Sequence, residues 1–249
     1  MSFTDRFSDR ADAYAAARPS YPDEAIDALL DGLGDPEAVT VADLGAGTGI
    51  SSRLLAARGA LVYAVEPNGP MRDAADAHPR VTWVDATAEH TGLDEASIDL
   101  VTAFQAFHWF DTRAALDEMV RIVRPGGRAA VIYNERDDQD PFTAAYGVLV
   151  RRYQNDDTER RRAYGMETFA QFSAWHTLRR TVVANPHVLD LEGLLMRVRS
   201  TSYLPQSGPA ADELHAAVRA LFGVHERGGR VTIAMRTIVL AADVGADGG

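Results

Sequence analysis

Two acidic residues and a glycine-rich turn are the first candidates for ligand chemistry in this sequence. Asp43 ends an apolar, β-branched run, and Gly45, Gly47 and Gly49 then follow at alternate positions. Such a turn accepts backbone angles that residues with a Cβ avoid, and it lets a ligand approach at the positive end of the next helix. A second apolar run ends at Glu66, where nucleotide-binding βαβ units carry an acid for ribose hydroxyls. These residues predict the binding of a nucleoside-containing ligand.

The spacing of the glycines separates two classes of cofactor. The dinucleotide fingerprint is G-x-G-x-x-G, and Ile50 stands where its last glycine would fall. The string DLGAGTG, Asp43 to Gly49, instead resembles the first motif of class I S-adenosylmethionine-dependent methyltransferases. That resemblance implies an α/β, Rossmann-like fold with a seven-stranded, mostly parallel sheet and helices on both faces. It implies S-adenosyl-L-methionine as the cofactor and S-adenosyl-L-homocysteine as its product.

Further segments match this family in the same order along the chain. YAAARPSYP, Tyr14 to Pro22, is similar to an N-terminal cap that folds over the cofactor. AFQAFHWFD, Ala103 to Asp111, resembles the fourth motif of type 11-like, small-molecule methyltransferases such as trans-aconitate methyltransferase. A helix over Thr112 to Val123, a PGG turn and a strand over Ala129 to Tyr133 also fit the pattern. Together the motifs span about half of the chain.

The resemblance assigns cofactor contacts to the matching positions. Glu66 would accept the ribose hydroxyls, and Arg18, with Tyr14, would reach the cofactor carboxylate, for which a planar guanidinium is suited. A solvated surface arginine is the alternative for Arg18. Met71 is a candidate adenine neighbour because a thioether is adaptable, and plain core packing is an equal alternative. The expected cofactor set is Tyr14, Arg18, Asp43, Gly45, Ala46, Gly47, Glu66, Pro67, Met71, Thr87, Ala88 and Gln105.

The adenine amino group is the point at which this sequence departs from the family pattern. The family often has an Asp where the alignment places Thr87, and the amide of the next residue, Ala88, would meet the ring. A hydroxyl is a weaker acceptor than a carboxylate, so Asp85 is an alternative partner. We expect Thr87 to take the role.

An aromatic run follows the strand expected over Ser97 to Ala103. Ligands of open α/β sheets lie outside the carboxyl ends of the strands, and the resemblance places His108 and Trp109 at the methyl or its acceptor. Imidazole titrates near neutrality, so His108 is the candidate catalytic residue. Core packing of the aromatics, with His108 bonded to a backbone carbonyl, is an equal alternative. The expected substrate-contacting residues are His108, Trp109 and Tyr203.

The periodicity of the chain predicts alternating strands and helices in its first half. We expect one domain over residues 1–249, with a cap over 1–24, a cofactor-binding half over 39–133, an inserted lid over about 135–175 and C-terminal elements over 176–249. We interpret the mixed-charge run Arg151 to Arg162 as a solvated helix face. Further expected elements are helices Asp23–Leu33, Ser51–Arg58, Met71–Ala77, Pro141–Tyr153, Leu191–Val198 and Pro209–Phe222, and strands Arg80–Val84, Leu178–Val183 and Arg230–Ala241.

Composition limits the remaining possibilities. A chain of 249 residues with 46% hydrophobic content can bury a full core. The net charge of -11 argues against a nucleic-acid partner, the absence of cysteine excludes a thiol nucleophile, and the absence of lysine excludes Schiff-base chemistry. We find no apolar span, signal peptide or metal-ligand spacing, so we expect a cytoplasmic monomer or homodimer without membrane or metal.

The sequence therefore favours S-adenosylmethionine-dependent O-, N- or C-methylation of a small molecule, including a carboxylate or a natural product. Two alternatives stay open. An NAD-linked oxidoreductase would use a similar fold, and Ile50 argues against it. A nucleotide-binding module that has lost catalysis would keep the same fold and motifs, because fold does not establish function.

Overall fold

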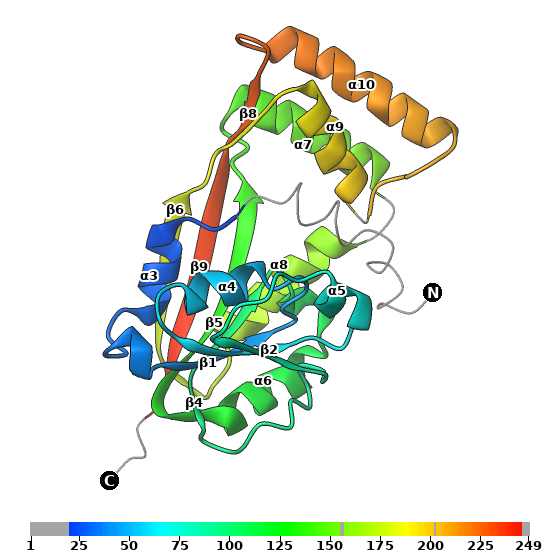
Figure 1. Ribbon diagram of the computed structural model, residues 1–249. Helices are drawn as coiled ribbons and strands as arrows, with labels where there is room; N and C mark the ends of the chain where they lie inside the picture. Colours follow the sequence, from blue (N-terminus) through cyan, green and yellow to red (C-terminus); the bar gives the residue numbers. More distant parts are fainter. Residues whose placement is uncertain (1–19, 155–156, 202, 246–249) are drawn as a thin grey trace. The chain divides into compact units, whose positions relative to one another are not determined.

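A mostly parallel sheet carries most of the described structure. The computed structural model describes residues 20–154, 157–201 and 203–245. In these residues seven strands form one sheet in the order β3-β2-β1-β4-β5-β9-β6, and β7 and β8 form a second, two-stranded sheet. The pairs β1–β2, β1–β4, β2–β3 and β4–β5 are parallel. The predicted seven-stranded Rossmann-like sheet is confirmed (Figure 1). No helix within these ranges is long and apolar enough to cross a membrane.

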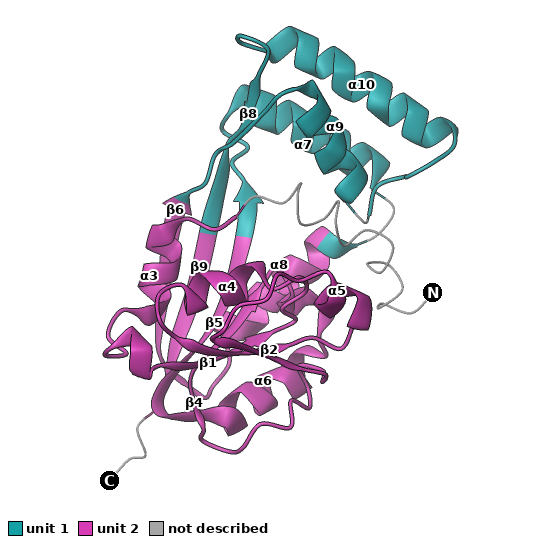
Figure 2. Ribbon diagram, viewed as in Figure 1, with its two compact units in different colours: residues 1–19, 134–158, 184–237 teal, residues 20–133, 159–183, 238–249 magenta. Residues whose placement is uncertain are grey.

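The described chain separates into two compact units, which Figure 2 shows in different colours. The described residues of 20–133, 159–183 and 238–249 form one, here called the sheet unit, and those of 134–158 and 184–237 form the other, here called the helical unit. The first elements of the sheet unit are α3 (Asp23–Leu30), β1 (Thr40–Leu44), α4 (Ile50–Ala56), β2 (Leu61–Val65), α5 (Gly69–Asp73), β3 (Val81–Val84) and β4 (Ile98–Phe104). They are followed by the 3-10 turn η2 (Phe107–Trp109), α6 (Thr112–Ile122) and β5 (Val123–Arg136), and later by α8 (Thr158–Ala170), β6 (Trp175–Ala184) and β9 (Met235–Val244). One end of β5, α8, β6 and β9 belongs to the helical unit, namely residues 134–136, 158, 184 and 235–237.

The sheet unit buries both faces of its strands, because successive side chains point to opposite faces. In β5, Val131 and Tyr133 pack in one hydrophobic cluster with residues of α6 and α8, whereas Ala130 and Ile132 pack in another with residues of α3 and α4. All four of these strand residues are fully buried. Helices therefore cover both faces, as the parallel pattern requires.

The helical unit has its own core. Its elements are α7 (Pro141–Tyr153), β7 (His187–Leu189), α9 (Leu191–Ser200), α10 (Pro209–His225) and β8 (Val231–Ile233). Buried side chains from all of these helices meet in one cluster, including Tyr146 of α7, Leu195 of α9 and Leu214 of α10. The β7–β8 ladder is antiparallel and adds Val231 and Ile233 to this core.

The division of the chain differs from the expected lid over about 135–175. Residues 159–175 belong to the sheet unit, and residues 184–237 join 134–158 in the helical unit. The physical reason is packing: Phe169 of α8 is fully buried in a core cluster of the sheet unit, with Met166, Phe172 and Trp175 around it. The cap expected over 1–24 lies mostly outside the described residues.

Two expected elements have different boundaries in the structure. The strand expected over Arg230–Ala241 is two strands, β8 and β9, which pair with different partners and are separated at Ala234. The PGG break lies inside β5, where the register with β4 jumps from the pair Ile98–Val123 to the pair Leu100–Arg128. The extra residues on β5 form a bulge in which Gly126 has a φ of 77°.

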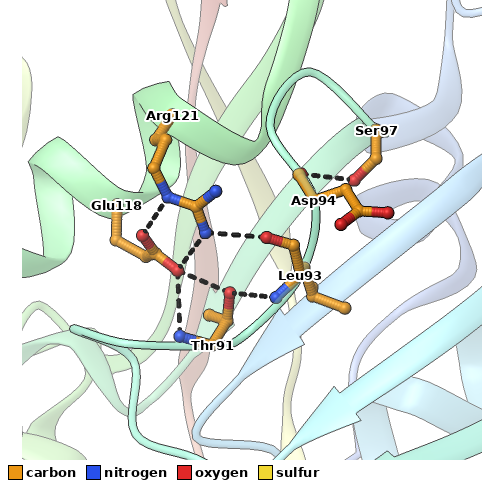
Figure 3. A network of polar contacts seen from close by, with 6 residues as sticks. All are labelled: Thr91, Leu93, Asp94, Ser97, Glu118 and Arg121. Carbon is orange, nitrogen blue, oxygen red and sulfur yellow. Dashed lines mark hydrogen bonds and ion pairs between the residues drawn. The ribbon is translucent and has the colours of Figure 1, made fainter.

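A buried carboxylate holds the loop between β3 and β4 to α6 (Figure 3). Glu118 accepts hydrogen bonds from the amide (2.9 Å) and the hydroxyl (2.6 Å) of Thr91, and from Arg121 Nε (2.7 Å). Arg121 also donates to the carbonyl of Leu93 at 2.8 Å. Burial opposes ionisation of Glu118, but the hydrogen bonds from Arg121 and Thr91 outweigh it and lower the pKa from 4.5 to about 2. The loop tied in this way carries Thr87 and Ala88.

We predict that Glu118→Gln destabilises the fold by about 2 kcal/mol at neutral pH. The glutamine amide has one acceptor oxygen instead of two and lacks the negative charge that pairs with Arg121. The native pKa lies below the ordinary value, so the stabilisation is full above that value and is lost as the pH falls from 4.5 toward about 2. Urea unfolding of wild type and variant between about pH 7 and pH 3 measures this. Glu95→Gln, an exposed carboxyl of the same loop, is the control and should change little. A difference that stays constant with pH would contradict the assignment.

Candidate functional site

The turn after β1 is built from three glycines in the left-handed region. Gly45, Gly47 and Gly49 have φ values of 66°, 58° and 73°, which residues with a Cβ rarely adopt. The amides of Gly45 and Ala46 donate to the carbonyl of Val65, the last residue of β2, at 2.8 and 3.1 Å. The glycine turn is thereby fixed to the carboxyl end of the neighbouring strand.

The same turn contacts the segment that follows β4. A Cβ built on Gly45 would lie 2.7 Å from the Cβ of Ala106 and 3.0 Å from the ring of Phe110. The contact follows from the register, because Asp43 pairs with Thr102 and both strands run in the same direction. The chain goes from β1 to one side and from β4 to the other, so the contact lies at the topological switch point where open α/β sheets bind ligands.

Glu66 lies directly against the glycine turn. Its Oε2 accepts from the amide of Gly47 at 2.9 Å and its Oε1 accepts from the amide of Asn68 at 2.9 Å. Burial raises the pKa of this carboxyl, and the two amide bonds offset part of the shift. Each oxygen keeps a second acceptor position. The predicted acid and the predicted turn are therefore brought together by a hydrogen bond.

Asp43 is enclosed in the protein. Its side chain is fully buried, and its two oxygens accept hydrogen bonds from the hydroxyls of Ser51 (2.7 Å), Ser52 (2.6 Å) and Thr102 (2.9 Å). Burial raises the pKa of Asp43 and the three hydroxyls lower it, with a net rise. The carboxylate thus joins β1, the start of α4 and β4. It links the elements on either side of the turn, and its membership of the cofactor set stays a prediction.

The other predicted cofactor residues near the turn have different exposures. Met71 is buried, and its Cε lies 3.4 Å from a Cβ built on Gly47. Asn68 caps α5 by accepting from the amide of Met71 at 3.1 Å, which fixes that side chain beside the turn. Ala46 is buried and Pro67 is exposed. The structure brings Met71, Gly47 and Glu66 into one cluster.

The adenine candidates lie on the loop after β3. Thr87 is exposed and forms an isolated bridge with His90, and Ala88 is buried in the core of the sheet unit. Asp85, the alternative to Thr87, is held by a two-pronged ion pair in which Arg72 Nη1 and Nη2 donate at 2.9 and 2.8 Å. Its carboxylate already has an ionic partner, which favours Thr87 as the remaining candidate.

The end of β4 has an unusual backbone. Gln105 has a φ of 54°, a conformation that is uncommon for residues other than glycine. Its amide donates to the carbonyl of Ile132 in β5 at 2.8 Å. Positive φ at a residue with a long side chain costs free energy and is found disproportionately at functional sites. Here it turns the chain from β4 into η2, which carries the aromatic run.

His108 and Trp109 lie together on η2. His108 is buried, and its ring centroid is 4.7 Å from that of Trp109 and 5.9 Å from that of Tyr133 in β5. Phe107 is fully buried and makes edge-on contacts with Phe110 and with Phe169 at 5.9 Å each. Phe107 is therefore a core residue, as the packing alternative predicts. Trp109 is half-buried.

Three predicted site residues are described apart from this cluster. Tyr14 and Arg18 lie outside the described residues. Tyr203 belongs to the helical unit, where it packs against the core of that unit, and is therefore described separately from His108 and Trp109. In the ranges the structure describes, no three His, Asp or Glu residues are grouped as a metal site would require.

The sequence reasoning missed several residues of the site. Ser51, Ser52 and Thr102, whose hydroxyls donate to Asp43, are one such group. The sequence does not indicate which hydroxyls will contact a buried carboxylate. Arg161 and Arg162 are another: the run Arg151 to Arg162 was expected to be a solvated face, yet both side chains are half-buried against aromatic rings. The missed signal is the helical spacing of Arg161, Gly165 and Phe169, four residues apart.

Known proteins that are similar to this chain are methyltransferases. Residues 42–131 match the family model of a methyltransferase domain. An uncharacterized methyltransferase of Mycobacterium tuberculosis is 37% identical over 198 residues, which is 79% of this chain and 76% of that protein. A methyltransferase-like protein of Schizosaccharomyces pombe is 34% identical over 57% of each chain. A solved structure from Anaeromyxobacter dehalogenans, titled as a type II methyltransferase, is 26% identical with a TM-score of 0.67, covering 92% of this chain and 97% of that one.

A mostly parallel sheet with a glycine turn after one strand and an acid after the next is typical of α/β proteins that bind nucleoside-containing ligands. With these relatives, the chain belongs to the class I S-adenosylmethionine-dependent methyltransferase family. The predicted family is confirmed.

We predict that Glu66→Ala weakens S-adenosylhomocysteine binding by at least about 10-fold, or about 1.4 kcal/mol. The substitution removes the acceptor for the Gly47 amide as well as the predicted ribose contact. Gly47→Val should have the same effect, because a φ of 58° is strained for valine and its side chain would reach Met71. Calorimetry measures both affinities.

Glu24→Ala is the control, since that carboxyl is exposed in the first turn of α3. It should bind S-adenosylhomocysteine as the wild type does, and thermal unfolding should show that all variants are folded. Unchanged affinity in both Glu66→Ala and Gly47→Val would refute the assignment, as would tight binding of NAD by the parent protein.

Proposed function

We propose that this protein transfers the methyl group of S-adenosylmethionine to a small-molecule acceptor. The observation that carries the proposal is the hydrogen bond between Glu66 and Gly47, which joins the acid of β2 to the glycine turn of β1. Membership of the methyltransferase family supports it. O-, N- and C-methylation are all compatible with the site, and a carboxylate or a natural product is within the range of acceptors.

The residues present fit such a cofactor. The amide of Gly47 donates to the Glu66 carboxylate, and a Cβ at Gly47 would lie 3.4 Å from the Cε of Met71, so a side chain there would fill the space beside the turn. Glu66 would hold the ribose, Met71 would lie against the adenine, and Thr87 with the Ala88 amide would meet its amino edge. Gln105 would contact the cofactor from the end of β4, and Arg18, with Tyr14, its carboxylate. Asp43, Gly45, Ala46 and Pro67 would shape the turn and its rim.

The cofactor supplies an activated methyl group on a sulfonium, so the protein need only align the acceptor and keep water out. The contact of Gly45 with Ala106 and Phe110 brings the turn against the segment that carries His108. The rings of Phe107, Phe110 and Trp109 exclude water from this region. The segment from Gln105 to Phe110 therefore provides the acceptor side of the site in this proposal.

His108 has two possible roles, which depend on the acceptor. A carboxylate has a reference pKa near ~4 and is a nucleophile at neutral pH, so it needs only placement. A hydroxyl, an ammonium or a carbon acid must lose a proton, and His108 would accept it. Trp109 would then pack against the acceptor. The acceptor contact of Tyr203 stays a prediction from the sequence.

Two measurements test the proposal together. Calorimetry with S-adenosylhomocysteine and with NAD separates a methyltransferase from an NAD-linked oxidoreductase. Labelled methyl transfer to a panel of carboxylates, hydroxyls, amines and activated carbons then separates an enzyme from a nucleotide-binding module on the same fold. S-adenosylhomocysteine binding with turnover on one acceptor class supports the proposal, and NAD binding without S-adenosylhomocysteine binding overturns it.

We predict that His108→Asn lowers the rate constant for methyl transfer by about 100-fold or more if His108 is a general base, and removes the acid limb of the pH profile. If His108 only positions the acceptor, the loss should be smaller, should fall mainly on the acceptor KM and should leave the pH profile unchanged. Rates at several pH values with saturating cofactor distinguish the two roles. Wild-type behaviour of both His108→Asn and His108→Ala would assign His108 to the core.

A further inference from the structure

Helix α8 is held tightly against η2 within the sheet unit. A Cβ built on Gly165 would lie 3.3 Å from the ring of Phe107 and 3.8 Å from the Cα of His108. One turn later, Phe169 is fully buried and makes an edge-on contact with Phe107 at 5.9 Å. Gly165 is thus required for close approach, and Phe169 anchors the helix. These two contacts fix the face of α8 that points at the aromatic run.

Two successive residues of α8, one turn before these contacts, are arginines. Arg161 is four residues before Gly165, and Arg162 is four residues before Met166, which also packs on the core of the sheet unit. Residues four apart on a helix are neighbours on one face. The guanidinium carbon of Arg161 lies 4.4 Å from the ring centroid of Trp109, and that of Arg162 lies 5.8 Å from the ring centroid of Tyr133.

The two rings under these arginines are the rings that flank His108. The His108 centroid is 4.7 Å from Trp109 and 5.9 Å from Tyr133. Two positive charges and one imidazole therefore lie around one aromatic wall, in a chain whose net charge is -11. A guanidinium stacked on a ring is weakly hydrated and presents planar N–H donors that match carboxylate and phosphate oxygens.

We propose that the methyl acceptor carries an anionic group, a carboxylate or a phosphate, and that Arg161 and Arg162 bind it beside His108. This inference rests on the proposed function, because it names the acceptor class of the same site. The apolar rings of Trp109 and Tyr133 take the body of the acceptor, and the arginines take its charge. The anion orients the molecule toward His108 whether or not it is itself the atom that is methylated.

Three probes that share a phenyl ring test the proposal. Calorimetry compares benzoate, phenyl phosphate and benzamide, with and without S-adenosylhomocysteine. We expect at least one of the anions to bind about 10-fold or more tightly than benzamide, because charge-assisted hydrogen bonds are stronger than neutral ones. The order of benzoate and phenyl phosphate shows which of the two anions the arginines select.

Arginine variants test whether Arg161 and Arg162 cause the tighter binding of the anions. The double variant Arg161→Gln, Arg162→Gln should weaken binding of the preferred anion by about 10-fold or more and leave benzamide within about 2-fold. Arg160→Gln is the matched control, because it removes the same charge from an exposed position on the same helix, and it should leave all three probes unchanged. Single variants and Arg161→Lys, which keeps the charge without the planar fork, serve if the double variant unfolds.

Several outcomes would overturn the inference. These are equal binding of benzoate, phenyl phosphate and benzamide by the parent, no anion binding in the millimolar range, and unchanged anion binding in the arginine variants. Loss of S-adenosylhomocysteine affinity in the variants, with anion binding intact, would assign the arginines to the cofactor instead.

Failure of this inference is distinguishable from failure of the proposed function. S-adenosylhomocysteine binding with no dependence of anion binding on Arg161 and Arg162 leaves the methyltransferase proposal standing and removes the anionic acceptor. Arginine-dependent anion binding in a protein that does not bind S-adenosylhomocysteine supports the anion site and overturns the methyltransferase proposal.

Discussion

The site depends on one steric constraint, the absence of a side chain along the turn after β1. At Gly45 the position of a Cβ is taken by Ala106 and Phe110, and at Gly49 a Cβ would lie 2.9 Å from the ring of Trp83. Both residues also need a positive φ. The segments after β4 and within β3 can therefore reach the turn only because it is bare. A larger residue there would push apart the strand ends that a bound nucleoside must contact together.

Two buried carboxylates, those of Asp43 and Glu66, stabilise the region of this turn through different hydrogen bonds. Asp43 is fully buried, and its carboxylate accepts hydrogen bonds from three hydroxyls of the protein. Glu66 lies beside it and receives two amides, one of them from Gly47 in the turn itself. Burial raises the pKa of both, yet only Glu66 has acceptor positions directed at the turn. We therefore assign a structural role to the enclosed acid, Asp43, and keep Glu66 as the proposed ligand-binding acid.

Sequence patterns predicted the part of the site that local chemistry defines. The glycines, Glu66 and the strands around them follow from short-range rules for turns and buried strands, and the structure has them where the patterns indicated. The residues that the patterns missed depend on tertiary contacts. The split of the last strand at Ala234 reflects the pairing of β8 with β7, and the placement of Arg161 and Arg162 reflects the packing of Phe169 on Phe107. A run of charged residues is predicted to be solvated unless it is known which element packs against the helix.

The two sides of the site therefore differ in how they are specified. The glycine turn is fixed by backbone angles and by hydrogen bonds to β2, so almost any change in it disturbs cofactor geometry. The wall around His108 is built by side chains from η2, β5 and α8, with Gly165 and Phe169 setting the distance of the helix. Residues of α8 that face this wall, such as Arg161, can change while those two anchors stay. In the proposed site the cofactor turn and the acceptor wall are thus specified by different residues, which is why the glycine motif identifies the family and does not identify the acceptor.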